Sequence, residues 1–587
     1  MRSALPKLPL LTALLLSTFA CPAPAIAAEP RPNILLILAD DMGWGDLRCH
    51  GNDRLDTPVL DQLKSQSVEL DHFYVSPVCS PTRSSLLSGR HHLRLRVINT
   101  TNALEVMSGD EVTIAEALKP AGYVTGCFGK WHNGSNHPST ARGQGFDEFF
   151  GFSGGFFSNY FDPELEHNGV VAPRKGFITD VIADAALAFI ERERTHPFFC
   201  YVPFNACHSP MQAPADLFAK YSQRGFAPME AAVYAMVENL DHNTGRLLAK
   251  LDELGLAANT IVIFATDNGP NSRRFNGGMR GGKGSVFEGG MRVPCFIRWP
   301  GKLEAGKVIS QIAQHVDVLP TLLDFAGVPS PTGRPLDGMS LGPLLRGTAK
   351  AWPERTLFDL TGRGGKDGVP MPLYPGTART PTHRWVHDGK QEYLFDLRND
   401  PGEANNLLTQ EPALAAKLAG TYERWFREAT APTGGKVKRF PITLTAGTEL
   451  LVPSAELRGG ARFFGKGWDY DWATGFDSPN AAIVWNLEVP QAATYEAQVL
   501  YTAKSTGGFV RVEVGGNTVQ GAINAAHEPP EIPRPDLVTR WEVPDKVFRP
   551  LGIGRIAIPA GPHEFKVTAT TGVEIQTVRL HRIPVAK

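Results

Sequence analysis

The stretch Asn33-Ile34-Leu35-Leu36-Ile37-Leu38-Ala39-Asp40-Asp41 is a continuous apolar run that ends in two adjacent carboxylates. A run without alternating polar residues is expected of a parallel strand that is covered on both faces of its sheet. Residues 197–202 and 260–265 have the same character. Between these runs, helix-like apolar spacing is found at residues 113–119, 178–191 and 231–254. Strands that alternate with helices predict an α/β domain with a mainly parallel sheet flanked by helices.

The composition is that of a packed globular protein. Of the 587 residues, 42% are hydrophobic and 20% are charged, which excludes a disordered chain. The 59 Lys and Arg nearly balance the 60 Asp and Glu, so nothing in the net charge of −1 favours nucleic acid or anionic lipid as a partner. The 59 glycines and 47 prolines indicate many turns and loops.

The pattern changes twice along the chain. After residue 350 it becomes mixed, with a strand expected at 392–397 and a helix at 412–428. After residue 440, Tyr495, Ala497, Val499 and Tyr501 alternate with polar residues, as in a β-sandwich. We therefore expect a signal peptide at 1–28, a catalytic α/β domain at 29–350, a smaller α+β subdomain at 351–440 and an all-β jelly-roll sandwich at 441–587.

The N-terminus resembles a secretory signal. Arg2 and Lys7 precede an apolar run from Leu8 to Ala20, which small residues around Ala25 and Ala27 follow. The run is shorter than the roughly 20 residues that a membrane span needs. We expect a secreted or periplasmic protein without stable membrane insertion, with lipoprotein anchoring at Cys21 as the alternative.

Acidic and amide side chains follow two of the buried-type strands. Asp40 and Asp41 come after the first strand, and Asp267 and Asn268 come after residues 260–266. Ligands of open α/β sheets bind at the carboxyl ends of the strands, and hard oxygen donors suit Ca²⁺ or Mg²⁺. The alternative is that these residues cap helices or stay solvated.

Four further segments carry residues that could take part in catalysis. Cys79 and Arg83 are four residues apart, so a helix that begins at Cys79 would place both on one face. A guanidinium group is a preferred partner of oxyanions. Lysines and histidines near a metal would neutralise an anion and transfer protons; the candidates are Lys130, His132, His208 and Lys283. Each also has a plain alternative, as a buried thiol or a solvated surface side chain.

The combination resembles the type I, formylglycine-dependent sulfatases of the alkaline phosphatase superfamily over roughly residues 30–430. The pentapeptide Cys79-Ser80-Pro81-Thr82-Arg83, followed by Gly89-Arg90, is the most specific match. The other matching stretches are Pro32 to Gly43, Gly122-Tyr123, Gly129 to His132, Thr266 to Gly269, Lys283-Gly284, Glu288 to Pro294, Asp337 to Leu341, and Tyr393 to Pro401.

The resemblance implies a reaction. Cys79 would be oxidised to formylglycine by a formylglycine-generating maturation enzyme, and one hydroxyl of the hydrate would attack sulfur to give a covalent sulfate-enzyme intermediate. The second hydroxyl would then expel sulfate. One Ca²⁺ ion, or Mg²⁺ as the alternative, would be bound by Asp40, Asp41, Asp267, Asn268 and the oxygen on residue 79.

The resemblance also assigns roles to the other candidates. Arg83 would hold the modified residue, and Lys130 and Lys283 would contact the sulfate oxygens. His132 would take a proton from the diol, while His208, with Lys283, would protonate the leaving oxygen. Asn133 and Cys207 depart from the residues common at these places in the family, which affects the expected substrate preference and not the reaction. Whether Cys207 pairs with Cys200 stays open.

The tail resembles a carbohydrate-binding module. Trp468, Tyr470 and Trp472 lie in one loop region, where they could stack on sugars or pack against the protein. We therefore expect an exported sulfatase that acts on a sulfated carbohydrate, for example in polysaccharide degradation. The alternatives are a phosphonate monoester or phosphodiester hydrolase of the same superfamily, and an inactive glycan-binding relative. The sequence leaves the oligomeric state open.

Overall fold

The computed structural model describes residue 1, residues 30–362 and residues 367–584. The predicted signal peptide, including Cys21, therefore lies outside the described residues apart from Met1. Within the described ranges, no helix combines the length and apolarity needed to cross a membrane.

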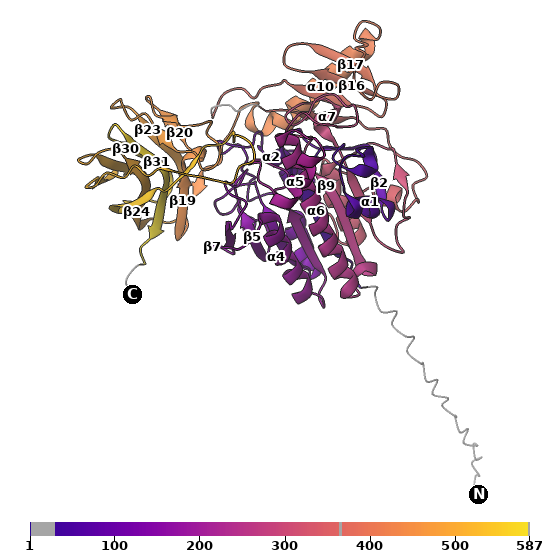
Figure 1. Cartoon of the computed structure of the whole chain (residues 1–587), viewed down its shortest axis with the longest axis horizontal. Helices are drawn as coiled ribbons and strands as arrows, with labels where there is room; N and C mark the ends of the chain where they lie inside the picture. Colours follow the sequence, from indigo (N-terminus) through magenta and orange to yellow (C-terminus); the bar gives the residue numbers. More distant parts are fainter. Residues whose placement is uncertain (2–29, 363–366, 585–587) are drawn as a thin grey trace.

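A ten-stranded sheet forms the centre of the larger part of the molecule (Figure 1). Its spatial order is β12 (Val308–Ile309), β2 (Val68–Leu70), β11 (Cys295–Arg298), β9 (Thr260–Thr266), β1 (Asn33–Ala39), β8 (Phe198–Pro203), β4 (Val124–Lys130), β5 (Glu148–Phe152), β6 (Glu164–His167) and β7 (Val170–Pro173). The five neighbours from β9 to β5 are all parallel, and antiparallel strands extend the sheet on both sides. The expected α/β fold with a mainly parallel sheet is confirmed.

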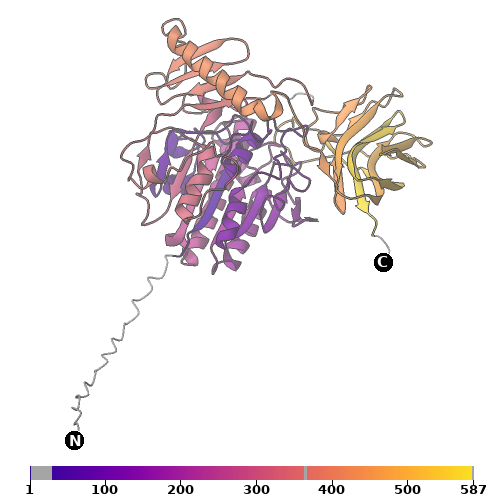
Figure 2. The same ribbon diagram turned by 180° about the vertical axis from the view of Figure 1, so that it is seen from behind.

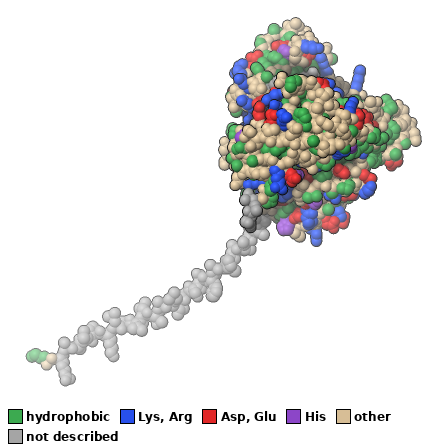
Figure 3. Space-filling view, turned by 90° about the vertical axis from the view of Figure 1, so that its left-hand side faces the viewer, with side chains coloured by type: hydrophobic (Ala, Val, Ile, Leu, Met, Phe, Trp, Pro, Cys, Tyr) green, Lys and Arg blue, Asp and Glu red, His purple; other side chains and the backbone are tan. Residues whose placement is uncertain are grey.

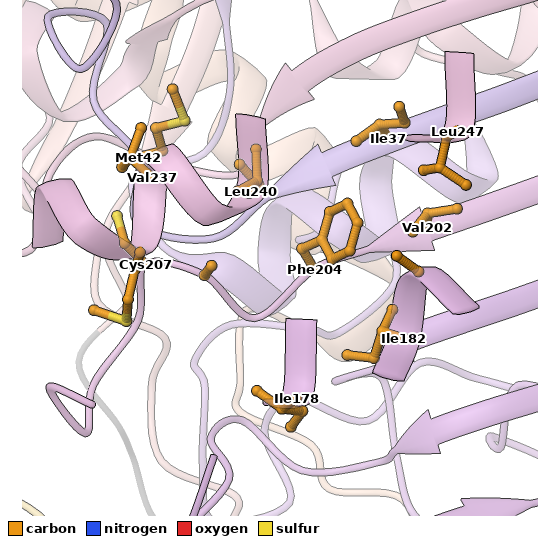
Figure 4. Packing of buried hydrophobic residues seen from close by; sticks show 14 of the residues in the cluster. Ile37, Met42, Ile178, Ile182, Val202, Phe204, Cys207, Val237, Leu240 and Leu247 are labelled. Atoms are coloured by element: carbon orange, nitrogen blue, oxygen red, sulfur yellow. The ribbon is translucent and has the colours of Figure 1, made fainter. Parts of the chain in front are cut away.

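Helices cover both faces of this sheet, which explains why β1 is continuously apolar. Leu35 and Ile37 face a core with α4 (Ile178–Arg192) and α6 (Pro228–Glu253). Figure 4 shows Ile37 and Val202 on neighbouring strands, with Ile182 of α4 and Leu247 of α6 packed on the same side. The alternate residues of β1 face a second core with α2 (Cys79–Ser88), α3 (Ile114–Leu118) and α8 (Val318–Ala326).

Shorter elements surround this framework. The remaining α-helices described in this part are α1 (Pro58–Ser65), α5 (Ala215–Gln223), α7 (Glu288–Met291) and α9 (Gly342–Leu345). A small sheet joins β10 (Arg292–Val293), β3 (Phe73–Tyr74) and β13 (Ala313–Gln314).

A four-stranded antiparallel sheet follows in the chain. It consists of β14 (Leu357–Leu360), β15 (Gly376–Arg379), β16 (His383–His387) and β17 (Glu392–Asp396). The helix α10 (Pro412–Thr430) packs on it through Leu418 and Tyr422, which contact the cluster around Trp385. Figure 2 shows this unit at the edge of the larger part of the molecule, apart from the C-terminal strands.

The C-terminal region consists of two six-stranded sheets that enclose one apolar core. The first contains β18 (Ile442–Thr443), β20 (Glu456–Arg458), β23 (Ala482–Val489), β25 (Phe509–Val514), β26 (Asn517–Ala522) and β30 (Gly561–Ala569). The second contains β19 (Gly447–Leu451), β21 (Arg462–Phe463), β22 (Ala473–Thr474), β24 (Ala493–Ala503), β29 (Arg549–Ile558) and β31 (Val573–Arg582). We call this pair of sheets the C-terminal sandwich; the domain boundaries expected at 350 and 440 stay predictions.

The sandwich lies beside the β5–β7 end of the large sheet (Figure 1). On the face of the described residues drawn in Figure 3, basic and acidic side chains are interspersed across the surface.

Candidate active site

The parallel strands bring the predicted residues together at one edge of the sheet. Ala39 of β1 is in register with Thr266 of β9, so Asp40 and Asp267 leave the sheet side by side. β8 ends at Pro203, five residues before His208, and β4 ends at Lys130. The convergence follows from topology, because parallel neighbours have their carboxyl ends at the same edge.

Several oxygens in this cluster have no hydrogen-bond partner although they are buried. These atoms are Asp40 Oδ1, Asp41 Oδ2 and Asn268 Oδ1. Ligand atoms of Asp40, Cys79 and Asp267 lie within 4.8 Å of one another. Leaving buried polar atoms unpaired is costly, and hard oxygens grouped in this way suit a divalent cation such as Ca²⁺. The donor set therefore fits the predicted metal site.

Cys79 is the first residue of α2 and is buried beside these carboxylates. Burial raises the pKa of its thiol, so the unmodified side chain is a protonated thiol at neutral pH and a poor nucleophile. Arg83, one turn further along α2, donates to Asp267 Oδ2 from Nε and Nη2, at 3.0 and 2.7 Å. The predicted helix and the shared face of the two residues are confirmed.

Two lysines reach the same carboxylates from separate segments. Lys130 Nζ lies 2.6 Å from Asp40 Oδ2, and Lys283 Nζ lies 2.6 Å from Asp41 Oδ1. Burial alone would raise the pKa of Asp41. The positive charges of Lys283, His208 and Lys130 outweigh this effect and hold the pKa of Asp41 well below its usual range. Both ammonium groups therefore flank Cys79 and can neutralise an anion bound there.

The two predicted histidines differ in hydrogen bonding. His132 Nε2 lies 2.9 Å from the carbonyl oxygen of Thr100, and its buried Nδ1 has no partner. Since a carbonyl oxygen only accepts, Nε2 carries the proton and Nδ1 is free to receive one. His208 Nδ1 lies 2.7 Å from the carbonyl oxygen of Ser209, while its Nε2 faces Asp41 Oδ2 at 3.7 Å.

Burial and nearby positive charge act on both imidazoles. Burial, followed by the charge of Lys283, lowers the pKa of His208 to about 3. Burial and the charge of Lys130 also lower the pKa of His132 well below its ordinary value. An anion bound among these groups would favour the protonated form of His208.

A cavity of about 300 Å³ opens over Cys79 and contains residues that the sequence analysis did not single out as site residues. Its wall includes Asp469, Trp541 and Glu542 of the C-terminal sandwich, together with Trp468. For Trp541 and Glu542, the one signal in the sequence was a tryptophan in a connection rich in proline and charged residues.

The aromatic loop has three different environments. Trp472 is buried in the sandwich, stacked on Phe464 with ring centroids 4.4 Å apart. Tyr470 packs against Phe156 of the catalytic region, with centroids 5.4 Å apart. Only Trp468 of the three lines the cavity. Packing against the protein, which we considered as the alternative, thus accounts for Trp472 and Tyr470.

The cysteines described by the structure are all free. Cys200 and Cys207 are both buried and do not pair with each other. The question left open by the sequence is therefore answered for the described residues.

Glu105 is a buried carboxyl group near Asp469, and its shifted pKa can be tested by experiment. Burial and the charge of Asp469 raise its pKa to about 7, whereas an unfolded glutamate titrates near about 4.3. Between these values the folded chain binds more protons than the unfolded chain, so this group's contribution to stability falls as the pH rises.

We expect Glu105→Gln to remove this loss. Its melting temperature should exceed that of the parent by roughly 2 °C at pH 8 and by less than about half of that at pH 5. Thermal unfolding at both pH values measures the difference, and Glu428→Gln on the exposed face of α10 is the control. An equal difference at both pH values would contradict the shifted pKa.

Comparisons with known proteins identify the family of the chain. The sulfatase family model matches residues 32–328, and the model for the C-terminal part of N-sulphoglucosamine sulphohydrolase matches residues 282–423. The chain is 36% identical over 442 residues to N-acetylgalactosamine-6-sulfatase of Homo sapiens, which covers 65% of this chain and 82% of that protein. It is 32% identical over 538 residues to steryl-sulfatase of Mus musculus, and this match covers 68% of this chain and 83% of that protein.

Solved structures give the same result for the fold. The structure of Ps i-CgsB in complex with k-i-k-neocarrahexaose superposes with a TM-score of 0.62 at 28% identity, and covers 67% of this chain and 92% of that chain. The family model spans half of the chain and contains Asp40, Cys79 and Asp267. The chain therefore belongs to the sulfatase family and is a sulfuric ester hydrolase.

Proposed function

We propose that this protein is exported and removes sulfate esters from a sulfated carbohydrate. The observation that carries the proposal is the placement of Cys79 between the unpartnered oxygens of Asp40 and Asp41 and the ammonium groups of Lys130 and Lys283. The relatives named for N-acetylgalactosamine-6-sulfate hydrolysis and the structure with a bound neocarrahexaose support a sugar as the alcohol part.

Two groups that the family uses would complete the site. We propose that Cys79 is converted to formylglycine by a maturation enzyme, so that its hydrate provides two hydroxyls, one for attack on sulfur and one for release of sulfate. Asp40, Asp41, Asp267 and Asn268 would hold one Ca²⁺ ion, whose positive charge would make the nucleophile easier to deprotonate and would polarise the sulfate.

The protein's own side chains perform the remaining steps. Arg83 fixes Asp267 through two hydrogen bonds and keeps the carboxylates in place. Lys130 and Lys283 stabilise the charge on the sulfate oxygens, a contribution that is often the largest in catalysis. His132 receives a proton at Nδ1, the nitrogen without a partner. His208 donates from Nε2 to the leaving oxygen once a bound anion has favoured its protonated form.

The sulfatase reaction is tested by comparing two substrates. Purified protein matured in a host with the formylglycine-generating enzyme should hydrolyse an aryl sulfate at least about tenfold faster than phenyl phosphonate, as kcat/KM. The reason is that two lysines and two histidines surround the position of the sulfate. Faster phosphonate hydrolysis would favour the phosphonate monoester hydrolase alternative. Hydrolysis of neither substrate by protein with a modified Cys79 would leave the glycan-binding alternative.

A further inference from the structure

A long connection of the C-terminal sandwich is fixed to the catalytic region. It runs from the end of β26 at Ala522 to the start of β29 at Arg549, and contains only the short strands β27 (Glu531–Ile532) and β28 (Asp545–Lys546). The backbone N–H of Leu537 donates to the carbonyl of Met211 at 2.9 Å, and Gln212 Nε2 donates to Asp536 Oδ1 at 2.7 Å. The connection is thus held directly beside His208.

The connection then turns into the cavity over Cys79. Arg540 Nη2 donates to the carbonyl of Ser158 at 3.0 Å, which anchors the chain just before Trp541 and Glu542. Glu542 is buried and accepts a hydrogen bond from Ser209 Oγ, next to His208. Trp541 remains 41% exposed, with its side chain on the cavity wall. A large aromatic ring left open there offers a surface to a ligand.

A second segment of the sandwich, the loop between β21 and β22 that contains Trp468 and Asp469, also reaches the cavity. Asp469 accepts a hydrogen bond from the backbone N–H of Gly155. A Cβ at Gly155 would lie 2.6 Å from His132 Nε2 and 3.1 Å from Asp469 Oδ2, so only glycine permits this approach. Asp469 and Trp468 therefore lie close to His132 in the same cavity.

The cavity combines two kinds of chemistry. Its floor presents Cys79, Asp41, His208 and Lys283, while the sandwich contributes two indole rings and two carboxyl groups. Of the described residues that line it, Lys283 alone is a lysine or arginine. The end of the cavity at Lys283, with Lys130 buried behind it, suits one sulfate group. The remaining wall offers stacking surfaces and hydrogen-bond acceptors for hydroxyl groups.

We propose that the C-terminal sandwich forms the sugar-binding subsite of the active site, with Trp468 and Trp541 contacting a pyranose ring and Asp469 and Glu542 facing its hydroxyls. This inference rests on the proposed function. It assigns as substrate a sugar ring that carries a single sulfate and no other anionic group, because a second sulfate or a carboxylate would face Asp469 and Glu542. The sandwich is then a specificity element and not a separate binding module.

Trp541→Ala in the full chain tests the subsite. The parent is first assayed on hexose and N-acetylhexosamine monosulfates, and the best of them serves as substrate. We expect the variant to raise KM about tenfold, the loss of roughly 1.4 kcal/mol of ring contact, with kcat changed less than KM. Inhibition by inorganic sulfate, which occupies only the floor, should keep its Ki. Trp541→Phe should restore most of the affinity.

Phe464→Ala is the matched control, because Phe464 is a 50% exposed aromatic of the same sandwich that does not line the cavity. Its KM should equal that of the parent. Glu542→Gln should reduce the preference for a monosulfated sugar over the same sugar with two sulfates. Melting temperatures of all variants separate loss of binding from loss of folding.

The outcomes distinguish this inference from the proposed function. An unchanged KM in Trp541→Ala, or a parent that hydrolyses disulfated sugars but none of the monosulfated ones, would overturn the subsite alone. A parent that hydrolyses no sulfate ester after verified maturation would overturn the proposed function.

Discussion

Replacing Cys79 by alanine is expected to lower kcat on an aryl sulfate by a factor on the order of 10⁵, because it removes the nucleophile on which every other group acts. The fold should persist, since the change removes only the terminal atom of one small buried side chain at the start of α2. Steady-state kinetics and a thermal unfolding curve measure the two effects. Cys127→Ala is the matched control, because Cys127 is equally buried but belongs to the core around β4 and not to the cavity.

Cys79→Ser separates the attack from the release. A serine hydroxyl can attack sulfur and displace the alcohol, but it lacks the second hydroxyl that expels sulfate. We expect a burst of about one alcohol per protein molecule followed by very slow turnover. Mass spectrometry of the peptide spanning residue 79 must show an intact serine in the variant and formylglycine in the parent. Normal turnover by either variant would contradict the assigned nucleophile.

The second large effect is expected from Asp40→Asn. Asp40 Oδ1 is one of the unpartnered buried oxygens, and its charge is part of what would attract a cation. We expect Ca²⁺ affinity to fall on the order of 100-fold, with a corresponding loss of activity at limiting Ca²⁺. At a Ca²⁺ concentration of 100 times the parent's Kd, the ion stabilises the parent by about 2.7 kcal/mol and such a variant by about 0.4 kcal/mol.

Unfolding with and without Ca²⁺ therefore reads out the site independently of activity. Asp317→Asn is the control, since Asp317 is also a buried carboxylate in an ion pair, with Arg355, but lies outside the cluster. An Asp40→Asn variant that keeps the full Ca²⁺-dependent shift would remove Asp40 from the metal site. Equal loss in Asp317→Asn would show that the effect is general destabilisation.

Most of the candidate site could be proposed from the sequence because its signals are local. The apolar run ending at Asp40 specifies a buried strand, and the spacing of Cys79 and Arg83 specifies one helical face. Two strands of this kind, each followed by carboxylate or amide groups, imply a shared site, because their carboxyl ends meet at one edge.

The pairings within the site could not be predicted in the same way. That Lys283 contacts Asp41 depends on how the loop after β9 folds back, and no periodicity specifies such a loop. Likewise, His132 could be named from its motif, but the free Nδ1 follows from the position of the Thr100 carbonyl.

The sequence by itself indicated the α/β fold, because each strand is encoded by a pattern within a few residues. Through its resemblance to the sulfatases it also indicated the chemistry and the candidate residues around Cys79, because that resemblance rests on short motifs. Only the tertiary structure decided that Trp541 and Glu542 lie over the same site. Glu542 meets Ser209 across 333 positions of the chain. Contacts of this kind arise where segments far apart in the sequence pack together, so no local spacing in the sequence encodes them.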